Sequence, residues 1–210
     1  MVHPLLTRNG LYAITNGPRA DLIEVCAAVL QGGATLLQYR DKTDDSARRL
    51  AEARSIAALC ARHGVPLIVN DDVELAAAIG AAGVHLGEDD ADIPSARARL
   101  GVGAIIGVSC YDSLERARNL TDAGADYLAF GAFHTSPTKP NARNATPALL
   151  REAKAFGLPL VAIGGITSEN GAALIKAGAN YLAVISAVFG AADVLAAARE
   201  FASLFGTTHS

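Results

Sequence analysis

The feature that most constrains the fold of this chain is a regular alternation of short apolar segments with longer segments of helical periodicity. Eight short runs rich in Val, Ile and Leu are expected to form strands, at residues 11–15, 35–39, 67–70, 84–86, 104–108, 127–131, 160–163 and 181–185. Ala-rich runs are expected to form helices at residues 21–31, 44–63, 73–81, 93–100, 113–123, 146–155, 168–176 and 191–205. Because a helix follows each strand, the pattern predicts parallel βα units along the whole chain.

An internal repeat indicates how these units close. Residues 123–129 (Ala-Gly-Ala-Asp-Tyr-Leu-Ala) recur at 177–183 (Ala-Gly-Ala-Asn-Tyr-Leu-Ala), and weaker copies occur at 33–34 and 82–84. The copies accompany the second, fourth, sixth and eighth expected strands, so each repeat spans two βα units. A closed (β/α)8 barrel would show this pattern, and we expect a single barrel domain over residues 1–210. The alternative is an open, doubly wound sheet, because Ala-Gly-Ala ends helices in many α/β proteins.

Composition excludes several other classes of protein. Hydrophobic residues make up 51% of the chain and charged residues 19%, which excludes a disordered chain. The net charge is −3 and no block of Lys and Arg occurs, so nucleic acid is not expected as a partner. No apolar stretch reaches the roughly 18 residues of a membrane-spanning helix, and no signal peptide is expected. Cys26, Cys60 and Cys110 form no CxxC pair, which indicates reduced thiols and a cytoplasmic location.

Polar side chains occupy the end of the second expected strand. Gln38, Arg40 and Lys42 alternate along the chain and would therefore lie on one face. Two cations and an amide on a buried strand are costly unless an anion meets them. The pattern therefore indicates a site for phosphate or diphosphate. A solvated edge strand is the alternative.

Carboxylates follow the third and fourth expected strands. Asn70 and Asp71 end the third, and Asp89 and Asp90 follow the fourth. In a barrel these strand ends meet at one rim, where such an oxygen-rich group would suit Mg²⁺. Either aspartate motif taken alone could equally cap a helix, but the nearby cations favour the metal site.

The ends of the sixth to eighth strands predict a second anion site. Ser136, Thr138 and Lys139 lie in the loop after the sixth strand, Gly165 follows the seventh, and Ser186 follows the eighth. Paired glycines expose backbone N–H groups, and the loops after strands seven and eight of a barrel commonly bind phosphate. Two phosphorylated substrates, or one long substrate, would fill both anion sites.

In this order, the motifs resemble those of the thiamine phosphate synthase family. The matching segments are residues 38–42, 70–71, 83–90, 107–109, 136–139, 162–166 and 184–186, so all but the first strand is covered. The resemblance implies a (β/α)8 barrel transferase of thiamine biosynthesis that uses Mg²⁺. Such an enzyme condenses 4-amino-2-methyl-5-(diphosphooxymethyl)pyrimidine with 4-methyl-5-(2-phosphooxyethyl)thiazole, or its carboxylated form, and releases diphosphate with thiamine monophosphate. Its partners would be these small molecules, without nucleic acid or membrane, and a homo-oligomer would be compatible with it.

The same resemblance implies roles for individual residues. The residues that would bind the pyrimidine diphosphate are Gln38, Tyr39, Arg40, Asp41, Lys42, Asn70, Ser109 and Lys139. Arg40, Lys42, Ser109 and Lys139 would be catalytic, and Asp71 and Asp90 would bind Mg²⁺. The residues that would bind the thiazole phosphate are Ser136, Pro137, Thr138, Gly165, Ile185 and Ser186.

Some features lie outside this pattern. Loop six departs from the family at His134 and Thr135, and we expect His134 to pack on the loop or face solvent. His85 is expected to be a hydrogen-bonded interior residue and Cys110 a small core residue. Two rival functions are a thiazole tautomerase of the same superfamily and a catalytically silent barrel that binds thiamine phosphates. The tautomerase would need neither the cation pair at residues 40 and 42 nor the carboxylates at 71 and 90.

Overall fold

A computed structural model describes residues 2–134 and 144–206, and within these ranges strands alternate with helices. The strands are β1 (Gly10–Ile14), β2 (Leu36–Tyr39), β3 (Leu67–Asn70), β4 (Gly83–Leu86), β5 (Ile105–Tyr111), β6 (Tyr127–Phe130), β7 (Leu160–Ile163) and β8 (Tyr181–Val184). The helices are α1 (Leu22–Gln31), α2 (Ser46–His63), α3 (Val73–Ile79), α4 (Ile93–Leu100), α5 (Leu114–Asp122), α6 (Pro147–Ala153), α7 (Ser168–Ala177), α8 (Ser186–Phe189) and α9 (Val194–Gly206). Two short 3-10 helices are η1 (Pro4–Leu6) and η2 (Lys154–Phe156).

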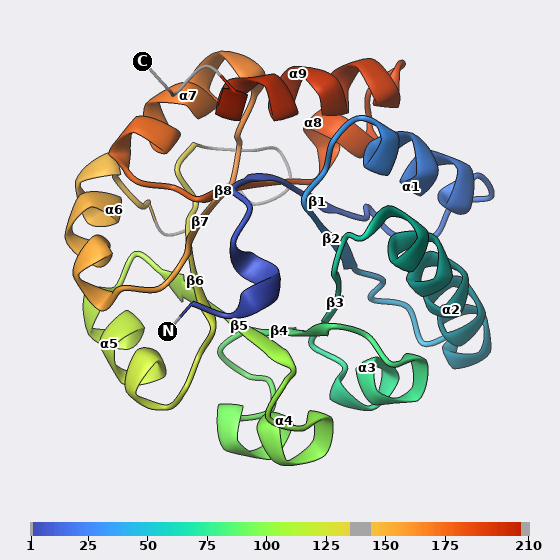
Figure 1. Cartoon of the computed structure of the whole chain (residues 1–210), viewed down its shortest axis with the longest axis horizontal. Coiled ribbons are helices and arrows are strands. Elements are labelled where there is room, and N and C mark those ends of the chain that lie inside the picture. Colours follow the sequence, from blue (N-terminus) through green and yellow to red (C-terminus); the bar gives the residue numbers. More distant parts are fainter. Residues whose placement is uncertain (1, 135–143, 207–210) are drawn as a thin grey trace.

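The strands close into a barrel. Each strand pairs with its neighbours in the sequence, β8 returns to β1, and every pair is parallel. Figure 1 looks along the barrel and shows the helices around the ring of strands. The predicted (β/α)8 barrel is confirmed, and the open sheet is excluded because β1 and β8 are hydrogen-bonded to each other.

Alternation of side chains along the strands produces two apolar cores. One core lies between the strands and the helices, and the other fills the barrel interior. Because both faces of each strand are covered, the strands are almost wholly apolar, as is usual in parallel sheets. The interior core consists of Leu6, Tyr12, Ile14, Leu36, Ile68, Ile105, Tyr127, Ala129, Val161, Tyr181 and Ala183.

The internal repeat has a structural role at the beginnings of β6 and β8. Asp126 and Asn180 occupy the same position in the two copies, and each accepts a hydrogen bond from a neighbouring strand. Asp126 Oδ2 lies 2.7 Å from the backbone N of Ile106, and Asn180 Oδ1 lies 2.9 Å from that of Leu160. The tyrosine after each of them enters the interior core. The two full copies of the repeat therefore join neighbouring strands in the same way, β5 with β6 and β7 with β8.

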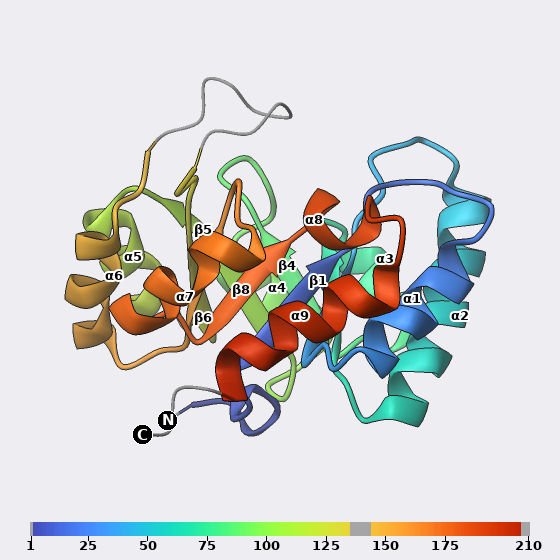
Figure 2. The same ribbon diagram turned by 90° about the horizontal axis from the view of Figure 1, so that it is seen from above.

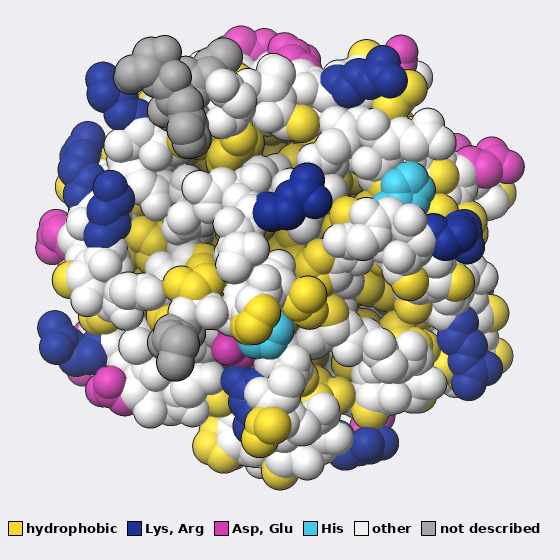
Figure 3. Space-filling view, viewed as in Figure 1, with side chains coloured by type: hydrophobic (Ala, Val, Ile, Leu, Met, Phe, Trp, Pro, Cys, Tyr) yellow, Lys and Arg dark blue, Asp and Glu magenta, His cyan; other side chains and the backbone are white. Residues whose placement is uncertain are grey.

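One end of the barrel is closed by η1. Leu6 is 2% exposed and belongs to the interior core, and His3 Nε2 lies 3.1 Å from the carbonyl oxygen of Gly103. Figure 2 shows η1 at the end opposite the loops that follow β2 and β4. Figure 3 looks onto the η1 face, where Lys and Arg side chains lie mainly along the edge. Neither η1 nor α8 was expected from the sequence, because three or four residues are too few to show a helical period.

Gly107 in β5 leaves the space that the Tyr127 ring occupies. A Cβ at residue 107 would lie 1.8 Å from Tyr127 Cζ and 2.3 Å from its hydroxyl oxygen. We expect Gly107→Ala to lower the free energy of unfolding by about 3 kcal/mol in a urea titration, since overpacking a core costs about this much. Gly103→Ala is the matched control: a Cβ there meets nothing within 4 Å, so the loss should stay below about 0.5 kcal/mol. Equally small losses in both variants would contradict a firmly placed Tyr127 ring.

Candidate active site

Gln38 points inward near the end of β2, and alternation along the chain places Arg40, just after β2, on the same face. Gln38 is 2% exposed, and its Nε2 donates to the Tyr12 hydroxyl at 2.6 Å. Thr15 fixes the backbone of Arg40, because Thr15 Oγ1 accepts from its N–H at 2.7 Å and donates to its carbonyl at 3.0 Å. No carboxylate of residues 2–134 and 144–206 pairs with the Arg40 guanidinium. This cation is therefore available to an anionic ligand.

Tyr39 and Asp41 point the other way, toward α2. The Tyr39 hydroxyl donates to Glu52 at 2.7 Å, and Asp41 accepts from Arg48 Nη1 at 2.7 Å. Burial raises the pKa of the Asp41 carboxyl, but hydrogen bonds from Arg48 and Thr43 outweigh it and hold this pKa below its usual value. Both side chains are bound by α2. Tyr39 and Asp41, two of the predicted substrate ligands, could therefore contact substrate only through their backbone groups.

The two aspartates after β3 differ in their surroundings. Asp72 caps α3, where its Oδ1 accepts from the N–H of Leu75 at 2.9 Å, and its Oδ2 pairs with Arg49 at 2.8 Å. Asp71 has a φ of 61°, in the left-handed region that aspartate adopts more readily than most residues. Its Oδ2 accepts a hydrogen bond from Lys42 Nζ at 2.7 Å. Asp72 is therefore a helix cap, which was the alternative interpretation. The Asp71 side chain instead lies beside Lys42 at the barrel mouth.

Asp90 lies next to Asp71. Its Oδ2 accepts a hydrogen bond from the backbone N–H of Gly87 at 2.5 Å. Burial raises the pKa of the Asp90 carboxyl and the Asp71 carboxylate raises it further, although Gly87 and Lys42 act in the opposite direction. A polar hollow of about 270 Å³ on the β2–β3 side is lined in part by Lys42, Asn70 and Asp71. Two carboxylates this close repel each other unless a proton or a cation lies between them.

His85 connects Ser109 in β5 to the barrel interior. Its Nε2 lies 2.9 Å from Ser109 Oγ and its Nδ1 lies 2.9 Å from the Tyr127 hydroxyl. Burial lowers the pKa of His85 to about 4, so the imidazole is neutral at neutral pH. The prediction of a hydrogen-bonded interior histidine is confirmed. Sequence reasoning missed the role of Tyr127, because a tyrosine in an apolar strand looks like any aromatic core residue.

The ends of β7 and β8 form the other half of the mouth. Gly165 has a φ of +62°, and a Cβ there would lie 2.6 Å from the His134 carbonyl oxygen, so glycine lets the chain after β6 pass close by. Ile185 precedes α8, and its carbonyl accepts from the N–H of Phe189 at 2.9 Å. Ser186 at the start of α8 is exposed, and so is His134, in line with the expectation of solvent or loop packing. Thr135 and the predicted site residues Ser136, Pro137, Thr138 and Lys139 lie outside the described residues.

Other chemistry is limited in the part of the chain that the structure describes. It contains no group of three or more His, Cys, Asp or Glu side chains that could hold a metal ion. Cys26, Cys60 and Cys110 are free and buried, and burial raises the pKa of each thiol to about 12, so none is an activated nucleophile. No helix among the described residues has the length and apolar character needed to cross a membrane.

Eight parallel βα units with a charged mouth at the carboxyl ends of the strands define the class: a (β/α)8-barrel enzyme. The sequence model of the family described as thiamine monophosphate synthase matches residues 11–188. A thiamine-phosphate synthase from Xanthomonas campestris is 53% identical over 203 residues, which cover 96% of this chain and 98% of the relative. One from Thiobacillus denitrificans is 55% identical over 199 residues, 93% of this chain and 94% of the relative.

A solved structure agrees with these relatives. The thiamine phosphate pyrophosphorylase from Pyrococcus furiosus has a TM-score of 0.89 at 33% identity, covering 98% of this chain and all of that one. The chain belongs to the thiamine monophosphate synthase family. It is a transferase of thiamine biosynthesis that forms thiamine monophosphate from phosphorylated pyrimidine and thiazole substrates.

Proposed function

We propose that the β2–β5 half of the mouth binds the pyrimidine diphosphate together with Mg²⁺. The observation that carries this proposal is the cluster of Lys42, Asp71 and Asp90, which follow three neighbouring strands. Lys42 Nζ lies 2.7 Å from Asp71 Oδ2, and burial together with the nearby Asp71 carboxylate raises the pKa of Asp90. A cation beside two carboxylates suits a ligand that brings both negative charge and a metal ion.

Asp71 and Asp90 fit a magnesium ion that is completed by substrate. Mg²⁺ in proteins is usually held by one or two carboxylates together with water and substrate phosphate oxygens. Burial is the main cause of the raised pKa of Asp90, and a cation between these two side chains would relieve the further contribution that comes from Asp71. When bound, the ion would neutralise charge on the departing diphosphate.

The chain's own cations and hydroxyl groups would hold the same leaving group. We assign this catalytic role to Arg40, Lys42 and Ser109, with Lys139 from the loop outside the described residues. Gln38 and Asn70 would contact the pyrimidine diphosphate from β2 and β3. Cleavage of the bond between the methylene carbon and the diphosphate oxygen leaves a cation that the aminopyrimidine ring stabilises. Catalysis therefore needs charge stabilisation on the leaving oxygens and no protein nucleophile.

The thiazole phosphate would bind in the other half of the mouth. Gly165, Ile185 and Ser186 lie at the ends of β7 and β8, the usual phosphate site of a barrel. Ser136, Pro137 and Thr138 are proposed to complete this site from outside the described residues. Its phosphate would anchor the substrate, which is 4-methyl-5-(2-phosphooxyethyl)thiazole or its carboxylated form. The ring nitrogen would then attack the methylene carbon of the cation after the diphosphate has left.

A product assay tests this proposal against its rivals. Purified protein is incubated with Mg²⁺ and with the pyrimidine diphosphate, the thiazole phosphate or both, and the products are separated by chromatography. We expect thiamine monophosphate and diphosphate in equal amounts only when both substrates are present. A change in the thiazole phosphate alone would favour the tautomerase, and binding without any product would favour the silent barrel.

We further propose that residues 1–210 act as a single domain in the cytoplasm. The interior and outer cores run through all eight βα units, which supports one folding unit. Three free, buried thiols suit a reducing compartment. A homo-oligomer is compatible with this proposal.

A further inference from the structure

Five polar side chains form a continuous hydrogen-bonded chain across the barrel interior. It runs from Gln38 on β2 to Tyr12 on β1, Tyr127 on β6, His85 on β4 and Ser109 on β5. The successive donor–acceptor distances are 2.6, 2.8, 2.9 and 2.9 Å. We call these five residues the interior polar chain. Its two ends are residues of the proposed pyrimidine diphosphate site, although they belong to strands that are not neighbours in the barrel.

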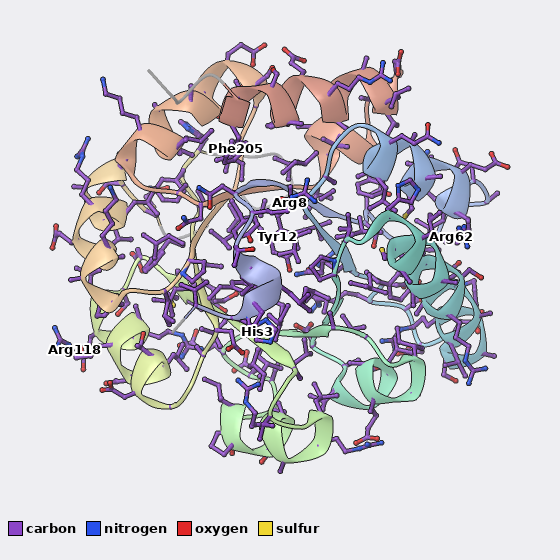
Figure 4. All side chains as sticks on the ribbon, in the orientation of Figure 1. His3, Arg8, Tyr12, Arg62, Arg118 and Phe205 are labelled. Atoms are coloured by element: carbon purple, nitrogen blue, oxygen red, sulfur yellow. The ribbon has the colours of Figure 1, made fainter. Side chains whose placement is uncertain are left out.

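The middle of this chain is sealed from solvent. Tyr12 is 1% exposed and Tyr127 is not exposed at all, and Figure 4 shows Tyr12 inside the ring of strands. The two rings meet edge to face with centroids 5.9 Å apart, and the Tyr127 ring stacks on His85 at 5.6 Å. A buried hydroxyl must find its hydrogen-bond partners among its neighbours. Both hydroxyl groups therefore donate their protons to other members of the interior polar chain.

The distances fit two directions of hydrogen bonding, and the orientation of the Gln38 amide selects one of them. With Gln38 Nε2 donating to the Tyr12 hydroxyl, we infer that Tyr12 donates to Tyr127 and that Tyr127 donates to His85 Nδ1. A neutral imidazole that accepts at Nδ1 carries its proton on Nε2, and it donates that proton to Ser109 Oγ. The hydroxyl proton of Ser109 is then left to point into the mouth.

The opposite direction of hydrogen bonding would also give every buried group a partner, but it would change what Ser109 and Gln38 offer to the mouth. The proton of Ser109 would point at His85 Nε2, the imidazole proton would move to Nδ1, and the Gln38 amide would turn its oxygen to Tyr12. Ser109 would then offer the mouth only lone pairs, which an anion repels, because a phosphate oxygen accepts hydrogen bonds and an ionised one has no proton to give. The direction of the chain therefore decides whether Ser109 is a donor to a bound diphosphate.

We propose that Tyr12, Tyr127 and His85 are positioning residues that hold Ser109 as a hydrogen-bond donor to the diphosphate and keep the Gln38 amide oxygen free to accept from the pyrimidine. The proposal rests on the proposed roles of Gln38 and Ser109. It explains why a strand of the apolar barrel wall carries a tyrosine whose ring requires glycine at residue 107. The proposal also means that the tautomer of His85 determines whether Ser109 can donate a hydrogen bond to substrate.

Kinetics of Tyr127→Phe test the proposal, because this variant removes only the hydroxyl that selects the His85 tautomer. We expect kcat to fall about 10- to 100-fold, the worth of one hydrogen bond to a charged group, with KM for the thiazole phosphate unchanged. Tyr181→Phe is the matched control. Tyr181 is 1% exposed in the same core, and none of the described residues hydrogen-bonds its hydroxyl, so kcat should stay within about twofold.

A double-variant cycle separates this proposal from the assignment of Ser109. In the Ser109→Ala background, Tyr127→Phe should cost no further activity, because its effect passes through Ser109. Wild-type activity in Ser109→Ala would overturn the role of Ser109 itself. A large loss in Ser109→Ala together with wild-type activity in Tyr127→Phe would overturn only the positioning role. Additive losses in the double variant would overturn it as well.

Nitrogen NMR reports the tautomer directly and does not depend on turnover. The protein is labelled with ¹⁵N-histidine, and His85 is assigned by the signal that His85→Gln lacks. With inorganic diphosphate and Mg²⁺ present, we expect the proton of His85 on Nε2, and we expect Tyr127→Phe to raise the population with the proton on Nδ1. A proton on Nδ1 in the wild-type protein would overturn the proposal.

Discussion

Asp71→Asn is expected to lower kcat for thiamine monophosphate formation by about 10²- to 10³-fold, the scale of losing one preorganised electrostatic group. The substitution removes one carboxylate of the proposed Mg²⁺ site and the partner of Lys42, whose Nζ lies 2.7 Å from Asp71 Oδ2. Initial rates at saturating substrates, measured across a range of Mg²⁺ concentrations, check this result. Asparagine has nearly the same shape as aspartate, so the protein should stay folded. The loss of kcat should therefore reflect the missing negative charge.

Asp92→Asn is the matched control for this loss. It also removes one carboxylate near the end of β4, but Asp92 is exposed and caps α4 by accepting from the N–H of Ser95 at 2.7 Å. Asparagine caps helices about as well as aspartate, so kcat should stay within about twofold. Equal losses of kcat in both variants would show that activity depends on the total negative charge of this rim. That result would contradict a specific role for Asp71.

Arg40→Met should lower kcat/KM for the pyrimidine diphosphate by about 10²- to 10³-fold, because it removes charge-assisted hydrogen bonds to the leaving group. Methionine keeps much of the apolar length of the side chain, and Arg40 has no carboxylate partner among the described residues that the variant would leave unpaired. The KM for the thiazole phosphate should not change. Steady-state kinetics with each substrate varied in turn separates the two effects.

Arg62→Met provides the control for net charge. Arg62 lies in the last turn of α2, is exposed, and points away from the barrel in Figure 4. Its kcat/KM should stay within about twofold of wild type, since an exposed charge far from the site contributes little. If Arg40→Met raised KM for both substrates equally, the assignment of Arg40 to the diphosphate half of the mouth would be wrong.

Much of the fold could be predicted because it follows from local periodicity. Apolar runs of four to seven residues between amphipathic segments mark strands and helices wherever the elements are long enough. The repeat indicated a closed barrel, which the pairing of β1 with β8 confirms. In the two full copies of the repeat, Asp126 and Asn180 each accept a hydrogen bond from the preceding strand. The elements that could not be predicted, η1 and α8, are too short for any period, and they form because tertiary packing holds them.

The candidate site was less predictable, because side-chain direction after a strand ends depends on the turn. Asp71 and Asp72 are adjacent and chemically identical, yet a φ of 61° leaves Asp71 for the mouth while Asp72 caps α3. Tyr39 and Asp41 alternate with the inward residues of β2 and meet α2 instead. The interior polar chain joins residues 115 positions apart, Tyr12 and Tyr127, and no local pattern shows such a contact.

The most direct test of the proposed site is calorimetric titration of inorganic diphosphate into the full chain with and without Mg²⁺. We expect Mg²⁺ to tighten diphosphate binding by about tenfold or more, equal to about 1.4 kcal/mol, and we expect this gain to disappear in Asp71→Asn and Asp90→Asn. Equal affinity with and without Mg²⁺ in the wild-type protein, or an unchanged gain in the two variants, would contradict a diphosphate site built on Asp71 and Asp90.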